Sequence, residues 1–175
     1  MTITAVMLMT ASAVTGAQTP AGAPAQELPG YESTLLALRD SVDRVRAELT
    51  RFQRDLQLAG AQTVVARARR VSSACEGLHR AMTESAPALQ VSASANQGLA
   101  RASQSLQSQM RETSRALTRE CKSGLGPEGP GSWADSLKAW GPHRTSQLEQ
   151  SLNAYERVVA GFTRAAGIEL KPRLP

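Results

Sequence analysis

Apolar residues recur every three or four positions along much of the chain, and this spacing predicts helices. Between residues 31 and 60 the steps alternate between three and four, which makes a seven-residue repeat. Such a repeat places an apolar seam along one side of a helix and lets it pack against neighbouring helices. The seam consists of Leu35, Leu38, Val42, Val45, Leu49, Phe52 and Leu56. We expect Gly60 to end this first helix.

The same pattern continues over residues 61–95. Its seam consists of Val64, Ala68, Val71, Cys75, Leu78, Met82 and Leu89. Pro87 interrupts the pattern, because a proline inside a helix removes a backbone hydrogen bond and clashes with the preceding turn. The helix therefore either stops near Ser85 or kinks at Pro87 and continues to the end of this range. Leu89 keeps the heptad spacing, which favours the kink, and residues 94–98 then supply a turn.

Two further helices follow. The third has the seam Leu99, Ala102, Leu106, Met110, Thr113, Leu117 and Cys121, and the fourth has Leu148, Leu152, Tyr155, Val159, Phe162 and Ala166. Glycine and proline crowd residues 124–131, which predicts a loop between the two helices. A short helix over residues 133–140, capped by Ser132, is expected next. The fourth helix then restarts at Pro142, since proline is tolerated at a first helical position, and Gly167 ends it.

These elements predict an all-α fold, an antiparallel up-down four-helix bundle over residues 31–166 with a short extra helix before the fourth. A three-helix array with a detached fourth helix is the alternative. The composition agrees with a helical chain: hydrophobic residues make up 41% and aromatic residues only 3%. A β-sandwich or barrel draws on more aromatic and β-branched residues than this. Residues 167–175 are expected to form a non-helical tail.

The first 17 residues have the character of a signal peptide. No charged residue lies between Ile3 and Val14, and small residues follow up to Ala17, where we expect cleavage. The basic residue that normally begins such a segment is missing. A buried helix and a retained apolar anchor are the alternatives, although the run is too short for a standard membrane span. Residues 18–30 contain three prolines and two glycines and are expected to be a flexible tether. We therefore expect an exported, periplasmic protein that is peripheral to the membrane.

The two cysteines are predicted to form a disulfide, as is common in exported chains. In an antiparallel helical hairpin, paired residues lie symmetrically about the turn. The midpoint of Cys75 and Cys121 is residue 98, a glycine in the predicted turn. Two buried free thiols are the alternative.

The sequence contains few groups for catalysis. It has no Cys-x-x-Cys, no phosphate-binding loop and no Gly-x-Gly-x-x-Gly, and it has only two histidines. Glu76 and His79 have the Glu-x-x-His spacing of di-iron helical bundles, but those bundles need a second such pair, which is missing here. We therefore expect no catalytic residue, no bound metal and no cofactor, and His79 is expected to flank the core.

Charge is distributed unevenly along the chain. The whole net charge of +5 lies within residues 61–122, where nine basic residues face four acidic ones. The basic residues form two groups: Arg67, Arg69, Arg70 and Arg80, then Arg101, Arg111, Arg115, Arg119 and Lys122. Such a surface fits anionic lipid headgroups or an acidic protein surface. Nucleic acid is disfavoured because no aromatic residues are interleaved with the arginines. An arginine-rich face that is merely solvated is the alternative.

Two tryptophans complete the candidate binding residues. Trp133 and Trp140 lie seven residues apart beside the glycine-rich loop, where they either anchor an interface or cap the end of the bundle. The candidates for partner binding are thus Arg67, Arg69, Arg70, Arg111, Arg115, Trp133 and Trp140.

Together these features predict a non-catalytic exported bundle that docks on and stabilises a larger protein complex, expected to be membrane-embedded, from the periplasmic side. A periplasmic bundle that binds a metal or small ligand between its helices is the alternative. The layout of residues 31–166 resembles the membrane-extrinsic helical subunits of bacterial photosynthetic reaction-centre and light-harvesting complexes. The resemblance implies a structural role in photosynthesis, on the outside of a membrane assembly.

Overall fold

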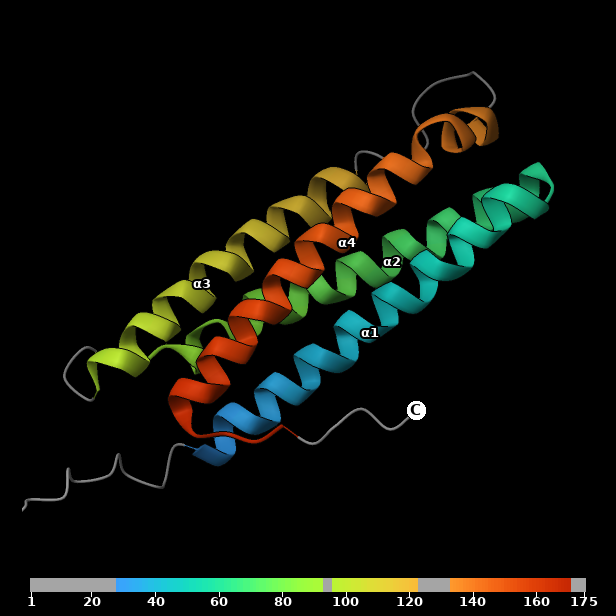
Figure 1. Cartoon of the computed structure of the whole chain (residues 1–175). Coiled ribbons are helices and arrows are strands. Elements are labelled where there is room, and N and C mark those ends of the chain that lie inside the picture. Colours follow the sequence, from blue (N-terminus) through green and yellow to red (C-terminus); the bar gives the residue numbers. More distant parts are fainter. Residues whose placement is uncertain (1–27, 93–95, 123–132, 171–175) are drawn as a thin grey trace, which may run out of the picture.

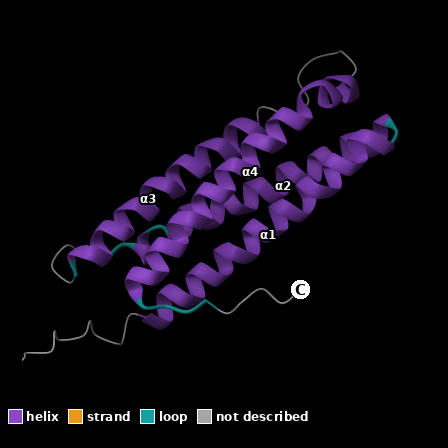
Figure 2. Cartoon of the chain, in the orientation of Figure 1, coloured by secondary structure: helices purple, strands orange, loops and turns teal. Residues whose placement is uncertain are grey.

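The computed structural model describes residues 28–92, 96–122 and 133–170, and within these ranges every regular element is a helix and there is no strand (Figure 1, Figure 2). The long helices are α1 (Leu28–Leu58), α2 (Ala61–Ser85), α3 (Gln97–Leu117) and α4 (Trp133–Ala166). A 3-10 helix, η1, covers Pro87–Leu89, and a π-helix, η2, covers Thr118–Lys122. The prediction of an all-α fold is confirmed.

The helices are organised in two main pairs. The helices α1 and α2, joined by Ala59 and Gly60, pack mainly against each other, and α3 packs mainly against α4. The pairs meet where α1 contacts α4 and where α2 contacts α3, η2 and α4. Figure 1 shows the four helices lying lengthwise beside one another.

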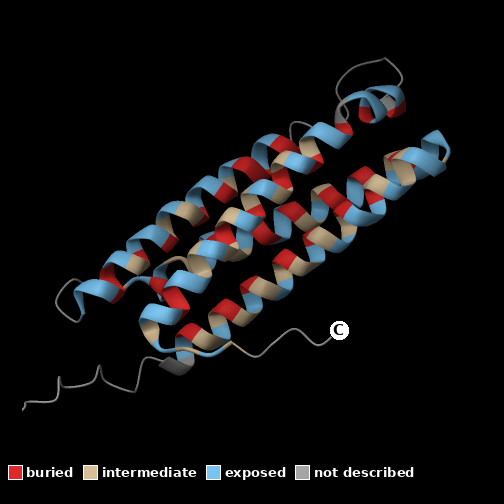
Figure 3. Cartoon of the chain, in the orientation of Figure 1, coloured by how far each residue is buried: buried red, intermediate tan, exposed pale blue. Residues whose placement is uncertain are grey.

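The core lies along the predicted seams, and Figure 3 shows the buried residues as stripes on the helices. The seam of α1 is buried from Leu35 to Phe52, and every predicted seam residue of α2 is buried. At one end of the molecule the rings of Tyr31 and Phe162 pack edge to face, with centroids 5.7 Å apart. This contact joins the beginning of α1 to the end of α4, so residues far apart in sequence share one apolar core.

The start of α1 differs from the prediction. Residues 28–30 were expected to belong to the tether, but the helix begins at Leu28 and includes Pro29 and Gly30. Proline is tolerated there because the first helical residues need no intrahelical N–H partner. The remaining tether and the predicted signal segment lie outside the described residues.

Of the two predicted alternatives at Pro87, the structure has the stop near Ser85, and the favoured kink is wrong. The α2 helix ends at Ser85, and its last hydrogen bond joins Ala86 N–H to the Met82 carbonyl. Pro87 then begins the 3-10 turn, a position where its missing N–H costs nothing. Leu89 is nevertheless buried, because the turn folds it back onto the core. The Ser103 hydroxyl of α3 holds this turn by donating to the Leu89 carbonyl at 2.7 Å.

The sequence predicted that Gly98 lies in the loop before the third helix. In the structure Gly98 belongs to the first helical turn of α3. The helix is capped by Asn96, whose side-chain oxygen accepts hydrogen bonds from the backbone N–H groups of Gly98 and Leu99. A cap of this kind satisfies backbone donors that have no partner within the helix. The asparagine therefore sets the helix start two residues before the first apolar residue.

The predicted short helix and fourth helix are one element. The α4 helix runs from Trp133 to Ala166 with Pro142 inside it. The predicted restart of the helix at this proline is therefore wrong. A proline within a helix removes one backbone hydrogen bond and bends the axis, and the first turns of α4 bend away from the rest in Figure 1. At the other end Gly167 adopts a φ of +67°, which stops the helix as expected.

We expect Gly77→Ala to raise the free energy of unfolding by about 1 kcal/mol, because glycine is the weaker helix former inside a helix. A Cβ atom at this position meets no atom within 4 Å. Gly141→Ala is the contrasting variant, since its Cβ would lie 3.1 Å from a Leu56 methyl carbon. Urea unfolding of both variants tests the expectation, and a Gly77→Ala protein no more stable than Gly141→Ala would contradict it.

Candidate functional site

Cys75 of α2 and Cys121 of η2 are joined in a disulfide, with the sulfur atoms 2.02 Å apart. The pairing is as predicted, although Gly98, the residue midway between them, lies within α3. The bond connects α2 to η2, the π-helical continuation of α3, where the two helix pairs also meet. Both cysteines are buried beneath a surface groove.

This groove lies between α2 and the end of α3 and has a volume of about 400 Å³. Its floor is apolar and consists of the disulfide and Leu117. Its polar rim comes from α2, which contributes the charged residues Glu76, Arg80 and Glu84 together with His79. The groove therefore combines an apolar base with both signs of charge, a surface able to hold a small polar ligand or a side chain of a partner.

His79 bridges the two helices that form the groove. One of its ring nitrogens, Nδ1, is hydrogen-bonded to the Ser114 hydroxyl of α3. The residue is exposed and lies beside the core, which is where the sequence placed it. Among residues 28–92, 96–122 and 133–170, no three His, Cys, Asp or Glu side chains are grouped so that they could hold a metal ion.

Arg67, a candidate for partner binding, joins α2 to α1. Its guanidinium donates to Asp55 at 2.8 Å and to Glu48 at 3.2 Å, and the side chain is mostly buried. The hydrogen bonds, first to Asp55 and then to Glu48, raise the pKa of Arg67. Its charge is therefore committed within the molecule.

The sequence contained a signal for this ion pair. Reflecting residue 67 about the turn at Ala59 and Gly60 gives residue 52, and Asp55 and Glu48 each lie about one helical turn from it. The mirror argument that paired the cysteines would also have paired this arginine with its two acids.

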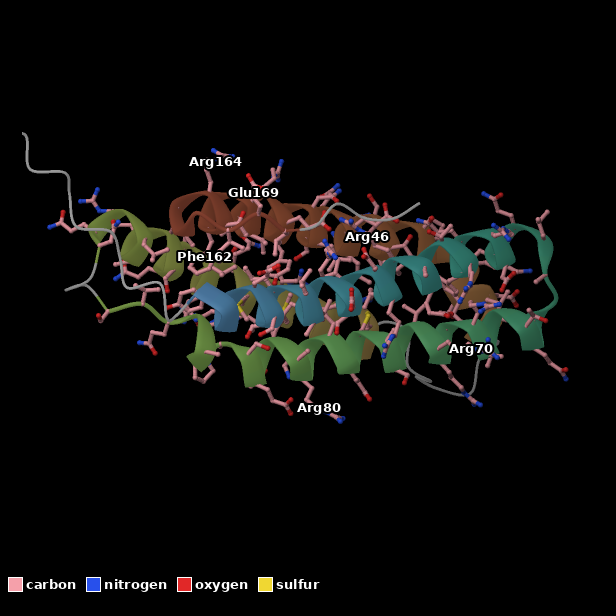
Figure 4. All side chains as sticks on the ribbon, turned by 90° about the horizontal axis from the view of Figure 1, so that it is seen from below. Arg46, Arg70, Arg80, Phe162, Arg164 and Glu169 are labelled. Carbon is pink, nitrogen blue, oxygen red and sulfur yellow. A yellow bond between two sulfur atoms is a disulfide. The ribbon has the colours of Figure 1, made fainter. Side chains whose placement is uncertain are left out.

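Two other arginines connect helices in the same way. Arg46 of α1 forms two hydrogen bonds of 2.9 Å with Glu156 and one of 2.6 Å with Asn153, both on α4. Figure 4 shows Arg46 between these helices. Arg144 of α4 donates at 3.2 Å to Glu120, whose side chain is only 4% exposed. The burial of Glu120 could not be predicted from the apolar spacing, because this residue lies in a π-helical turn that departs from α-helical periodicity.

The remaining arginine candidates are exposed. Arg69 and Arg70 lie on α2, and Arg111 and Arg115 lie on α3. The His79–Ser114 contact places Arg115 level with Arg80 rather than with Arg70. The α2 arginines near residue 70 and the α3 arginines therefore belong to different levels of the molecule and do not form one continuous cluster.

The tryptophan candidates begin α4. Trp133 is its first residue and Trp140 precedes Gly141. Their side chains lie outside the described part of the chain, so their role as anchors stays a prediction. Leu58, the last residue of α1, is 80% exposed.

Tyr155 is the one described residue with a buried side-chain oxygen or nitrogen that has no hydrogen-bond partner. The residue is 2% exposed and belongs to the apolar core. Burial, together with the negative charge of Glu156, raises the pKa of Tyr155 well above its usual value. An unpaired buried hydroxyl costs roughly 1–3 kcal/mol.

We expect Tyr155→Phe to be at least as stable as the wild type at neutral pH and increasingly more stable above about pH 10. In that range the phenol of the unfolded chain has lost its proton while the folded one keeps it. The unfolded state then binds fewer protons, so stability falls as pH rises, by up to about 1.4 kcal/mol per pH unit. Urea unfolding of both proteins over a pH series measures this difference. An identical pH dependence in the two proteins would contradict the expectation.

Comparisons with known proteins found no matching family model, no matching curated protein and no matching solved structure. In the described ranges, the helices lack any stretch long and apolar enough to cross a bilayer.

Proposed function

We propose that this chain is an exported, non-catalytic protein that docks on a larger membrane complex from the periplasmic side and stabilises it. In this proposal its four long helices form an antiparallel up-down bundle. Support for the bundle comes from the close α1–α2 and α3–α4 pairs and from the continuous apolar core that they share. The bundle acts as a rigid body that presents charged helix faces to its partner.

The observation that carries the proposal is the division of the arginines into two kinds. Arg46, Arg67 and Arg144 are bonded to acidic residues of neighbouring helices. In contrast, Arg70, Arg111 and Arg115 are exposed and have no hydrogen bond or ion pair with any described residue. Exposed cations without internal partners steer and orient an acidic partner.

A membrane complex is proposed as the partner because of the apolar N-terminal segment and the Pro-rich tether that follows it. The resemblance to the extrinsic subunits of photosynthetic complexes points in the same direction. Anionic lipid headgroups around such a complex would add to the attraction for the arginines.

The experiment is purification of the tagged full chain from solubilised native membranes, with identification and quantification of what is bound. We expect Arg70→Glu, Arg111→Glu and Arg115→Glu together to weaken binding mainly at low salt, because exposed charges are screened beyond about 8 Å at physiological ionic strength. The matched control is Arg54→Glu, Arg157→Glu and Arg164→Glu, which makes the same charge change on exposed positions of α1 and α4. Equal retention by wild type and the first variant, or equal loss in both variants, would reject this surface.

The tryptophans are tested separately. Trp133→Ala with Trp140→Ala is expected to weaken binding at every salt concentration, since burial of an aromatic anchor depends little on screening and is worth about 2 kcal/mol or more. Circular dichroism is the control. Loss of helicity in this variant would assign the two side chains to the core rather than to the interface.

The groove above the disulfide favours one other candidate function, the binding of a small ligand. Its volume of about 400 Å³ lies in the range of ligand pockets. An absorption spectrum and metal analysis of the purified protein distinguish the two functions. A stoichiometric metal or chromophore would favour ligand binding.

A further inference from the structure

A second hollow, on the outer side of the α1–α2 pair, has a volume of about 280 Å³. We call it the α1–α2 valley. The α1 helix contributes Ser41, Arg44 and Glu48, and α2 contributes Arg70, Ser73, Ala74, Gly77 and Leu78. It is open to solvent along its length and lies apart from the groove above the disulfide, with which it shares no lining residue.

The charge in the valley is not compensated. Arg44 and Arg70 enter it from opposite helices, both are exposed, and neither forms a hydrogen bond or ion pair with any described residue. The one acidic residue of the lining, Glu48, is bonded to Arg51 at 2.6 Å and to Arg67 at 3.2 Å. The valley thus presents two available guanidinium groups and no available carboxylate, which makes it complementary to an acidic partner.

The floor of the valley is low. Beside the two arginines, the lining consists largely of small residues: Ser41, Ser73 and Ala74 have short side chains, and Gly77 has none. Glycine is a poor helix former, and a Cβ at Gly77 meets nothing within 4 Å, so no contact inside the described chain requires glycine there. Small residues on a helix face allow the backbone of another helix to approach closely.

We propose that the α1–α2 valley binds an acidic helix of the partner complex. The helix lies along the small residues, and its carboxylates form charge-assisted hydrogen bonds with Arg44 and Arg70. A helix fits this surface better than a bilayer does, because the valley is concave and confined between two helices. This inference rests on the proposed function and names the chemistry of the partner's contact.

The probe is a labelled, alanine-based helical peptide of about 20 residues with Glu on one edge, titrated with the full chain by fluorescence anisotropy. Peptides with Gln or Lys in place of Glu are its counterparts. We expect the Glu peptide to bind and the Lys peptide not to bind. Arg44→Glu with Arg70→Glu is expected to weaken binding of the Glu peptide by about tenfold or more, since like charges facing each other disfavour association.

Two further variants test whether binding depends on the valley itself rather than on the overall charge or on a loss of folding. Arg101→Glu with Arg157→Glu makes the same charge change at exposed positions of α3 and α4 and is expected to alter affinity by less than about twofold. Gly77→Leu keeps every charge and strengthens the helix, but it raises a side chain into the valley and is expected to weaken binding by about tenfold. Circular dichroism and urea unfolding verify that all variants fold.

Three binding results with the purified chain would overturn the proposal. One is equal weakening by the control pair and the valley pair, and another is unchanged binding by Gly77→Leu. The third is valley-dependent binding to vesicles of phosphatidylcholine and phosphatidylglycerol without binding to the Glu peptide, which would assign the site to lipid. The co-purification experiment distinguishes a failure of this inference from a failure of the proposed function. If the Arg44→Glu, Arg70→Glu variant still retains the complex, binding in the valley is refuted while the proposed docking function stands.

Discussion

Replacing both Cys75 and Cys121 with serine is expected to lower the free energy of unfolding by about 4 kcal/mol. The bond closes a segment with a sequence separation of 46 residues and so restricts the unfolded chain. It also fastens α2 to the π-helical turn that carries the buried Glu120. Urea unfolding of the oxidised wild type and the double variant measures the loss.

The reduced wild type is the control for this expectation. It lacks the bond but keeps both cysteines, so its unfolding midpoint should match that of the double variant. A double variant as stable as the oxidised wild type would show that the remaining contacts hold α2 and α3 together without the cross-link.

Phe162→Ala is expected to destabilise the protein by about 4 kcal/mol, because truncating a fully buried phenylalanine loses its burial and leaves a cavity. Phe162 has 0% exposure and packs against the Tyr31 ring, so the change opens the contact between α1 and α4. Leu58→Ala removes an apolar side chain that is 80% exposed and is the matched control, expected to stay within about 0.5 kcal/mol of the wild type. Similar unfolding midpoints for the two variants would contradict the assigned core.

The heptad spacing was enough to predict which residues of α1 and α2 are buried. A residue that recurs at helical spacing must lie on one side of the helix, whichever partner covers that side. Phe52 and Met82 were identified in this way, and both are buried. The spacing does not predict where a helix begins or ends, because a single hydrogen bond at the cap can determine the first or last helical residue. The chain therefore starts α1 within the expected tether, against the prediction, and ends α2 at Ser85, the less favoured of the two predicted alternatives.

The candidate surfaces were harder to predict because a charge in a sequence does not reveal its partner. Arg67 and Arg70 are neighbours in a basic run, but one is bonded to two acids of α1 and the other is exposed. Arg44 went unnoticed because α1 carries equal numbers of basic and acidic residues, and its position beside the α1–α2 valley depends on how the two helices cross. Which arginines are available is a property of the packed helices, not of the charge count.

The Arg46 contact with Glu156 also has a consequence for the order in which the chain folds. The two residues are 110 positions apart, whereas the contacts of Arg67 with Asp55 and Glu48 span 12 and 19 positions. Short chain segments close quickly, so the α1–α2 pair can assemble before α4 docks against α1. We therefore expect the α1–α4 contact to form late in folding, so that loosening it accelerates unfolding and leaves the refolding rate nearly unchanged.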